Sequence, residues 1–313
     1  MDELVFYQIL LQQIFNGIVL GSLYALVALG YTMVYGILEL INFAHGEVVM
    51  LGAMVALTVL GVLSHAGYSG MWTVGVALAV AMPACVVTGL IIERIAYRPL
   101  RNSPRLAPLI TAIGVSIVLQ NLAMILWGRR YLSFPPVIEI HIYEWWGVSV
   151  TNVQLVIVAT AMTMMLGLLL LVGRTRIGRA MRATAQHREI AGLMGVDVNA
   201  VIAATFAIGS ALAAVAGVLV SAYYSLAHYA MGFMLGLKAF TAAVLGGIGN
   251  IPGAMLGGLL LGVIESLGAG YIGDLTGGFL GSNYQDIFAF FVLILVLILR
   301  PAGLLGERVT DRA

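Results

Sequence analysis

Successive runs of about twenty apolar residues constrain this chain more than any other feature of its sequence. Six runs carry no charged side chain and cover residues 14–38, 48–64, 72–92, 106–128, 152–173 and 201–224. Three weaker runs, each containing one charged residue, cover 229–248, 253–272 and 286–299. A helix of about 20 apolar residues crosses the hydrocarbon core of a bilayer, so these runs predict a polytopic membrane protein.

The composition excludes a soluble domain and indicates the type of secondary structure. Only 9% of the 313 residues are charged and 61% are hydrophobic, whereas soluble domains carry about 25% charged residues. The runs are apolar all round rather than alternating, which excludes membrane β-strands. We therefore expect one all-α transmembrane domain over residues 1–313, with about 8–9 crossing helices and some broken or re-entrant segments.

The arginines predict the orientation of the chain. They gather in three groups, which are Arg94, Arg98, Arg101 and Arg105; Arg174, Arg176, Arg179, Arg182 and Arg188; and Arg300, Arg308 and Arg312. Cationic loops stay in the cytoplasm, so the N-terminus should lie outside and the C-terminus inside. The segment 129–151 balances its two arginines with Glu139 and Glu144 and is rich in Tyr and Trp, as expected at the outer interface.

Small residues recur four positions apart in several of the runs. The pairs and triplets are Gly17 and Gly21; Gly209, Ala213 and Gly217; Gly253 and Gly257; and Gly258 and Gly262. This spacing predicts close helix packing in lipid. The segments 36–63 and 246–268 also resemble each other, because each has a polar, glycine-containing break followed by a Gly/Ala/Leu helix, as in transporters built from repeats.

Four polar side chains, Glu39, Asn42, His45 and Glu47, stand between the first two runs. They are expected at the cytoplasmic end of the first span, with Asn42 and His45 on one face if the turn is helical. Two interpretations are open: a polar station on a solute path, or a loop in water. Glycines on both sides favour a discontinuous helix.

Lys238 is the only lysine, and it lies within an apolar run, as does Glu265. An ammonium left in hydrocarbon costs about 3 kcal/mol or more. Lys238 is therefore expected to reach the interface, to pair with Glu265, or to line an aqueous cavity.

Residues 174–200 form the longest predicted cytoplasmic connection. An amphipathic helix is expected here, with Arg179, His187 and Arg188 on one side, followed by a break at Gly192 and Gly195. Such a segment suits a cytoplasmic protein partner. Contact between its arginines and anionic lipid headgroups is the alternative.

Motifs for enzymatic chemistry are absent from the sequence. Lys238 is flanked by Leu237 and Ala239, so there is no P-loop, and no HExxH or G-x-S-x-G occurs. One cysteine, Cys85, excludes an intrachain disulfide, and the five histidines lack metal-ligand spacing. We expect no cofactor, no metal, no nucleic-acid partner and no enzymatic activity.

Three stretches resemble the LivH-type permeases of branched-chain amino-acid ABC importers. They are NGIVLGSLYALVALGYTMVYGILELINFAHGEVVMLGA (16–53), GRAMRATAQHREIAGLMGVDV (178–198) and KAFTAAVLGGIGNIPGAMLGGLLLGVIE (238–265). The likeness runs from about residue 14 to 305. Urea-importer permeases and LivM-type permeases share much of the pattern, so urea-like amides or other amino acids are the alternative substrates.

The resemblance implies a subunit of the bacterial inner membrane that works with a second, LivM-type permease, two cytoplasmic ATPases and a periplasmic substrate-binding protein. It implies alternating access, with the path or gate candidates Asn42, His45, Glu47, Lys238, Thr241 and Glu265. It further implies an ATPase-coupling loop within 174–200, which includes Arg179, Arg182, Gln186, His187, Glu189, Gly192 and Gly195.

Three other classes remain to be weighed. An ion-coupled secondary transporter would need acidic residues in the middle of its spans, and only Glu265 clearly qualifies. A passive channel would conduct without partners. A scaffold for a partner permease would tolerate replacement of Asn42, His45 and Glu47.

Overall fold

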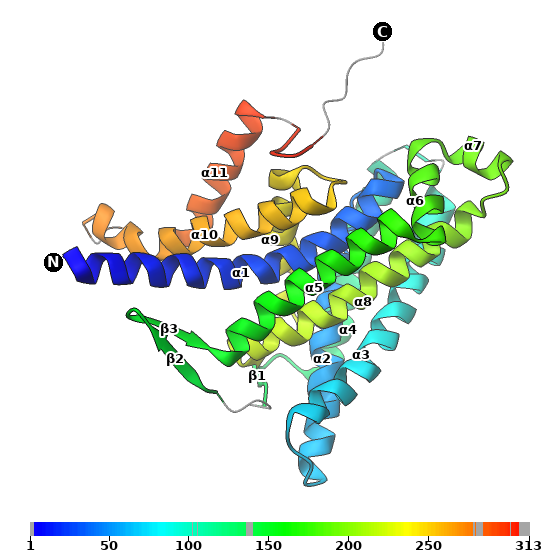
Figure 1. Ribbon diagram of the computed structural model, residues 1–313. Coiled ribbons are helices and arrows are strands. Elements are labelled where there is room, and N and C mark those ends of the chain that lie inside the picture. Colours follow the sequence, from blue (N-terminus) through cyan, green and yellow to red (C-terminus); the bar gives the residue numbers. More distant parts are fainter. Residues whose placement is uncertain are drawn as a thin grey trace.

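The computed structural model describes residues 3–101, 103–104, 106–135, 140–277, 279, 284–300 and 302–306 (Figure 1). Arg105, Glu139, Arg308 and Arg312, which contribute to the predicted charge groups, lie outside these ranges.

Helices make up nearly all of the described chain. The α-helices are α1 (Glu3–Leu38), α2 (His45–His65), α3 (Met71–Ile92), α4 (Leu106–Trp127), α5 (Asn152–Arg174), α6 (Arg176–Gln186), α7 (Arg188–Leu193), α8 (Val198–Tyr224), α9 (Met231–Gly246), α10 (Ile251–Leu275) and α11 (Gln285–Leu299). The end of α3 continues as a π-helix, η1 (Glu93–Tyr97), and a 3-10 turn, η2 (Arg98–Leu100). The expected all-α fold is confirmed.

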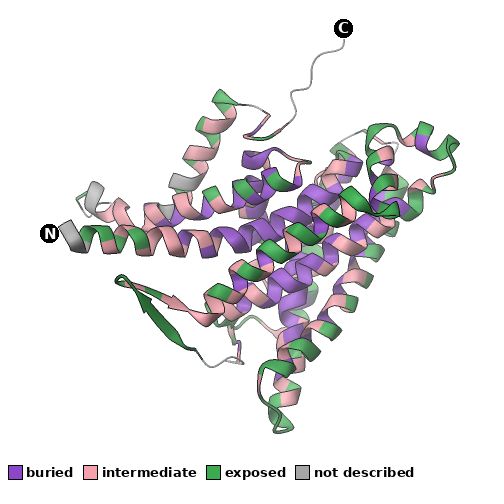
Figure 2. Cartoon of the chain, in the orientation of Figure 1, coloured by how far each residue is buried: buried purple, intermediate pink, exposed green. Residues whose placement is uncertain are grey.

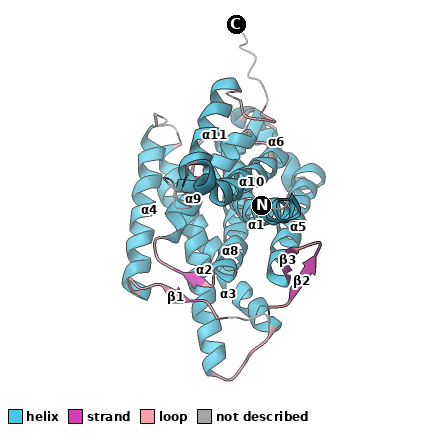
Figure 3. Ribbon diagram, turned by 90° about the vertical axis from the view of Figure 1, so that its left-hand side faces the viewer, coloured by secondary structure: helices cyan, strands magenta, loops and turns pink. Residues whose placement is uncertain are grey.

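Four short strands form two antiparallel pairs. β1 (Leu132–Ser133) pairs with β4 (Leu226–Ala227), and β2 (Ile142–Trp145) forms a hairpin with β3 (Val148–Thr151). These strands lie at the end of the bundle opposite α6 and α7 (Figures 1 and 3). The two ends agree with the predicted orientation, since the arginine-rich helices gather at one end and the Tyr/Trp-rich segment lies at the other.

Seven of the described helices are long and apolar enough to cross a membrane. They are Phe6–Leu38, His45–His65, Met71–Leu100, Leu106–Trp127, Asn152–Arg174, Val198–Tyr224 and Ile251–Gly273. Two expected spans, 229–248 and 286–299, correspond to α9 and α11, which have only 16 and 15 residues. Each is shorter than the 20 or so residues that a full crossing requires. They are candidates for partial crossings.

α1 forms the centre of the bundle. It contacts α10, α8, α9 and α5 along its length, and 89% of an apolar 18-residue stretch of it is buried, against 17% of the corresponding stretches of α4 and α5. Figure 2 shows the buried residues concentrated along α1 and α8. The exposed sides of α4 and α5 are apolar, which is expected of helices that face lipid.

The close approach of α1 and α10 depends on glycine. A Cβ atom on Gly258 would lie 2.6 Å from the Cα of Ala25, and a Cβ atom on Gly21 would lie 2.7 Å from the Gly258 carbonyl oxygen. Both distances are shorter than van der Waals contact, so only glycine permits this separation of the two backbones. The prediction of close packing through small residues is confirmed here.

Gly258→Val should therefore destabilise the protein by about 1–3 kcal/mol, because the added side chain meets the backbone of α1. The matched control is Gly114→Val in α4, where a Cβ atom meets nothing within 4 Å. Thermal unfolding in detergent, followed by tryptophan fluorescence, should show a lower midpoint for the first variant only. Equal midpoints for the two variants would contradict the packing argument.

Candidate functional site

The segment between α1 and α2 folds back into the bundle. The imidazole of His45 occupies the space beside Gly30, where a Cβ atom would clash with the ring. Gly30 lies eight residues before the end of α1 at Leu38, which is about 12 Å along a helix. α2 thus begins well inside the protein rather than at its surface.

Three of the four polar side chains in this break are buried. Asn42, His45 and Glu47 are 4%, 2% and 1% exposed, so the interpretation of a loop in water is wrong for them. It holds for Glu39, which is exposed. The three buried residues were expected at the cytoplasmic end of the first span, and this expectation is wrong. After α1 ends at Leu38, the chain turns back into the bundle before α2 starts at His45.

Each buried group faces a different helix. Oδ1 of Asn42 accepts a hydrogen bond of 3.2 Å from the Tyr97 hydroxyl of η1. The ring of His45 packs edge-on against Tyr31 of α1, with ring centroids 5.0 Å apart. Oε1 of Glu47 accepts a hydrogen bond of 3.1 Å from the Ser116 hydroxyl of α4. Asn42 and His45 therefore do not share a face. Asn42 precedes the helix, since its carbonyl accepts from the His45 amide.

The first turns of α2 and α9 meet at this depth. A Cβ atom on Gly46 would lie 2.9 Å from the Cα of Gly236, and one on Gly232 would lie 2.6 Å from Oε2 of Glu47. Glu47 is thus close to the N-terminal ends of two helices, whose dipoles favour a carboxylate. Its Oε2 has no hydrogen-bond partner among the described residues.

A second polar cluster joins α9 to three other helices. Nζ of Lys238 lies 2.6 Å from Oε1 of Glu265 on α10, 2.8 Å from Oδ1 of Asp286 on α11 and 3.3 Å from the Tyr24 hydroxyl on α1. The predicted pairing with Glu265 is confirmed. Thr241 belongs to neither cluster, because it is buried and its hydroxyl donates to the Leu237 carbonyl of its own helix.

The Asp286 contact was not predicted. Asp286 is the first residue of the last apolar run. A lone carboxylate at the start of such a run was a signal that this residue could pair with a buried cation. With both acids ionised, the cluster holds one positive and two negative charges. Glu265, whose side chain is only 2% exposed, depends most on this pairing, because a charge removed from water must be stabilised by an opposite charge and by hydrogen bonds.

A cavity of about 290 Å³ adjoins the Lys238 cluster. Its lining is mostly apolar and comes from α1, the end of α8, the β4 segment and α9, with Tyr24, Tyr131, Val220, Tyr224, Leu226, Ala227, His228, Met231, Met234, Leu235 and Lys238. Of the three alternatives expected for Lys238, the pairing with Glu265 is thus confirmed, and Lys238 also lines this mostly apolar cavity.

The opposite end of the bundle has a more polar groove of about 480 Å³. It lies between the end of α1, the η2–α4 connection and the α6–α7 pair, and both Glu39 and Glu189 line it. Across it, Nη2 of Arg188 donates to the carbonyl of Ile37 at 3.0 Å. This bond joins α7 to the last turn of α1, directly before the buried break.

The segment 174–200 forms two helices rather than the single one expected. His187 has an extended backbone, with φ −151° and ψ 102°, and separates α6 from α7. Gly195 then reverses the chain at φ +87°. All seven residues predicted for the coupling loop are exposed: Arg179, Arg182, Gln186, His187, Glu189, Gly192 and Gly195. Of these, Arg182 also donates to the Val172 carbonyl of α5.

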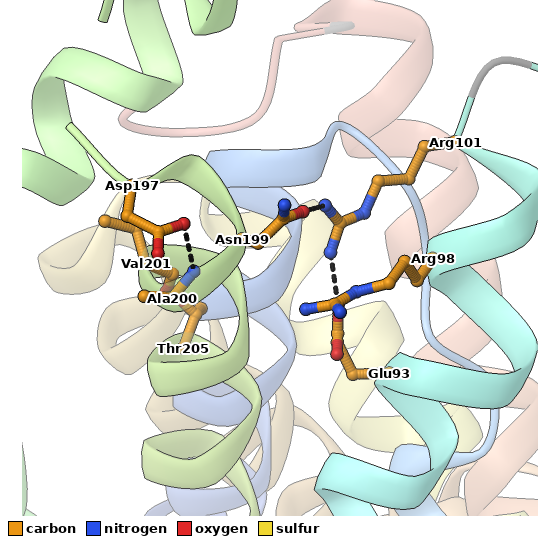
Figure 4. Close-up of polar contacts among 8 residues, drawn as sticks. All are labelled: Glu93, Arg98, Arg101, Asp197, Asn199, Ala200, Val201 and Thr205. Atoms are coloured by element: carbon orange, nitrogen blue, oxygen red, sulfur yellow. Dashed lines mark hydrogen bonds and ion pairs between the residues drawn. The ribbon is translucent and has the colours of Figure 1, made fainter. Parts of the chain in front are cut away.

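A charged cluster links the end of α3 to the start of α8 (Figure 4). Glu93, only 2% exposed, pairs with Arg101 and lies 3.5 Å from Nε of Arg98. Arg101 also donates to Oδ1 of Asn199 at 2.6 Å, two residues after Asp197, which caps α8. From the sequence, these arginines were predicted only to orient the chain; Glu93, the single acid beside them, was the signal of a structural ion pair.

These features together define the class of protein. The described chain is a bundle of membrane-length helices in which two helices start at depth, with ionisable groups buried beside them. Broken helices and buried charges of this kind characterise membrane transport proteins. Among the described residues, no group of three or more His, Cys, Asp or Glu side chains could hold a metal ion.

Comparison with known families identifies the chain more closely. Residues 13–297 match the family described as "Branched-chain amino acid transport system / permease component". The match covers most of the chain, which belongs to this family. The expectations of a permease, of a multi-pass protein of the inner membrane and of a transport rather than an enzymatic role are confirmed.

Similar curated proteins come from several bacteria. The permease protein LivH of the high-affinity branched-chain amino acid transport system of Salmonella typhimurium is 47% identical over 302 residues, which cover 95% of this chain and 96% of the relative. The permease protein BraD of the corresponding system of Pseudomonas aeruginosa is 46% identical, covering 98% of both chains. The ribose import permease RbsC of Escherichia coli is more distant, at 25% identity over 92% of this chain and 85% of its own.

The Lys238 cluster yields a stability prediction. Lys238→Met should destabilise the protein by about 3–5 kcal/mol, because it leaves two carboxylates inside the bundle without their cation. The double variant Lys238→Met/Glu265→Gln should recover part of that loss, because it also removes the more deeply buried acid. Unfolding midpoints in detergent measure both, and a single variant as stable as the native chain would contradict the pairing argument.

Proposed function

We propose that this chain imports branched-chain amino acids by alternating access, as one permease of an ABC importer. In this proposal it pairs with a second, LivM-type permease, two ATPases bind on the cytoplasmic side, and a periplasmic binding protein delivers the substrate. The chain acts as a single transmembrane domain, in which residues 174–200 form the ATPase-coupling loop. The observation that carries the proposal is the bond from Arg188 of α7 to the carbonyl of Ile37, next to the buried break.

The surface of α7 supports the coupling role. Leu193 and Met194 are 87% and 81% exposed at the tip of the segment, beside exposed Ile190. Apolar side chains that project this far from a bundle suit a groove on a protein partner. Anionic headgroups alone would attract the arginines of α6 but would not require this apolar tip.

Two contacts would transmit a movement of this loop into the bundle. Arg188 holds the last turn of α1, and Arg101 joins Asn199, at the start of α8, to Glu93 of η1, which continues α3. A push on α7 would therefore reach α1, α3 and α8 together. Alternating access requires an outward-open and an inward-open arrangement of these helices. ATP binding must favour one of them, since equal affinity for both would not shift the equilibrium between them.

The solute path would run where the helices are broken. Asn42, His45 and Glu47 would gate it from the first break, and Lys238 and Glu265, with Thr241 behind them, would contribute from α9 and α10. A binding protein would supply most of the selectivity. The sequence identity to relatives named for branched-chain amino acids supports this substrate over urea-like amides.

A secondary transporter is the second candidate, because Glu47, Glu265 and Asp286 are carboxylates within the bundle. Purification of the chain in mild detergent, with identification of the bound subunits, and uptake by the reconstituted complex would separate the two. The proposal expects co-purifying ATPases and leucine uptake that requires ATP and survives a proton uncoupler. Uptake that is lost with the uncoupler while ATP remains would favour the rival.

The coupling loop gives a specific prediction. Gly195→Val places a β-branched residue at φ +87°, a strain of about 1–3 kcal/mol that should displace α7 and reduce leucine uptake by about tenfold. Glu189→Lys should also reduce leucine uptake, because it reverses the charge of an exposed residue on the loop surface.

ATP hydrolysis by the complex and insertion of the chain should persist in both variants. The control is Gly173→Val, since Gly173 lies at the end of α5 with open space around it and no positive φ. Normal uptake with Gly195→Val, together with normal recovery of the ATPases, would refute the coupling role.

A further inference from the structure

We propose that the cavity beside Lys238 is an outward-facing binding site for the transported amino acid, with its aliphatic side chain against α9 and its charged groups at Lys238. The inference deepens the proposed function and rests on it. It assigns a specific binding role to a cavity whose apolar residues were not among the predicted path candidates.

The position of the cavity suits a solute that arrives from outside. Its lining includes Leu226 and Ala227, which pair with Ser133 and Leu132 of β1. That strand pair lies at the end of the bundle opposite α6 and α7 (Figure 3). The cavity is therefore at the outer end in the predicted orientation, and Lys238 lies one turn beyond Met234 and Leu235, toward the inside.

The lining fits a branched aliphatic group. Met231, Met234 and Leu235 project from successive turns of α9, opposite Val220 of α8. Methionine is flexible and polarizable, so it adapts to side chains of slightly different shape, such as those of leucine, isoleucine and valine. A volume of about 290 Å³ lies at the small end of ligand pockets, which suits one amino acid.

The charges at the inner end of the cavity fit a zwitterion. Lys238 offers an ammonium to a carboxylate, and Tyr24 and Tyr224 add hydroxyl groups. Oδ1 of Asp286, whose side chain is 31% exposed, lies 2.8 Å from the Lys238 ammonium next to the cavity lining and would attract the ligand's ammonium. A zwitterion adds no net charge to a site of low dielectric, whereas a free anion or cation would.

This chemistry disfavours urea as the ligand of the cavity. Urea is also neutral, but it has no apolar part to cover Met231, Met234 and Leu235. Apolar burial contributes about 25 cal/mol per Å², so the ligand that covers these side chains should bind more tightly.

The test uses cysteine protection in cells that contain the complete transporter and have had the outer membrane removed. The native Cys85 is fully buried, which gives an unreactive background. Met234→Cys introduces a thiol into the lining, and a small water-soluble maleimide measures its accessibility. Leucine at about ten times its dissociation constant should slow labelling by about tenfold, because occupancy removes the free site.

A matched control and other solutes make the result specific. Tyr68→Cys puts a thiol on the exposed turn between α2 and α3, 55% exposed and outside the cavity lining, and leucine should not change its labelling. Glutamate and urea should give little protection at Met234→Cys. Unchanged labelling of Met234→Cys with leucine, or protection by urea and not by leucine, overturns the inference.

Uptake by the native chain separates this inference from the proposed function. ATP-driven leucine uptake without leucine protection at Met234→Cys leaves the proposed function intact and rejects the site. Leucine protection without any leucine uptake supports the site and rejects the proposed function.

Discussion

A bilayer offers no water to backbone groups, so a helix can be interrupted at membrane depth only where protein surrounds the break. The structure depends on this constraint. The chain leaves α1 at Leu38 and restarts at His45, enclosed by α1, η1, α4 and α9. The glycines of α2 and α9 allow their first turns to touch, so two half-buried helix ends cover each other instead of facing lipid.

The buried break also connects the two ends of the molecule. On its inner side, Arg188 and the Glu93–Arg101–Asn199 contacts join α1, α3 and α8 to the segment that precedes α8. On its outer side lies the cavity, along which α9 runs inward past Met234 and Leu235 to Lys238. A movement at the inner end can thus alter the outer cavity through contiguous helices, which is the physical requirement for alternating access.

The charges within the bundle follow the same logic. Lys238 on α9 pairs with Glu265 on α10 and Asp286 on α11, and such a cluster stabilises one arrangement only while all partners remain in place. Because α11 contributes Asp286, the short last helix is bound to α9 by charge and packs against both α9 and α10. A rearrangement of these helices would have to exchange the partners of that ammonium.

The amino-acid sequence by itself determined the class of fold and the family, and it predicted the orientation. Hydropathy, arginine position and glycine spacing act locally along the chain, so the seven membrane-length helices, the division between the two ends and the close packing of α1 with α10 could be predicted. The pairing of Lys238 with Glu265 was also within reach, because a lone cation and a lone acid in apolar runs have few other solutions.

Only the tertiary structure decided how deep the break lies and which groups share it. The descent of residues 39–44 depends on space beside Gly30 and Gly232, and neither glycine differs in sequence from the many others in the chain. The separation of α6 from α7 at His187, the Asp286 partner and the cavity beside Lys238 likewise arise from contacts between helices far apart in sequence. Local patterns carry no information on such contacts, because the bilayer specifies that a helix must be apolar but not which neighbour it meets.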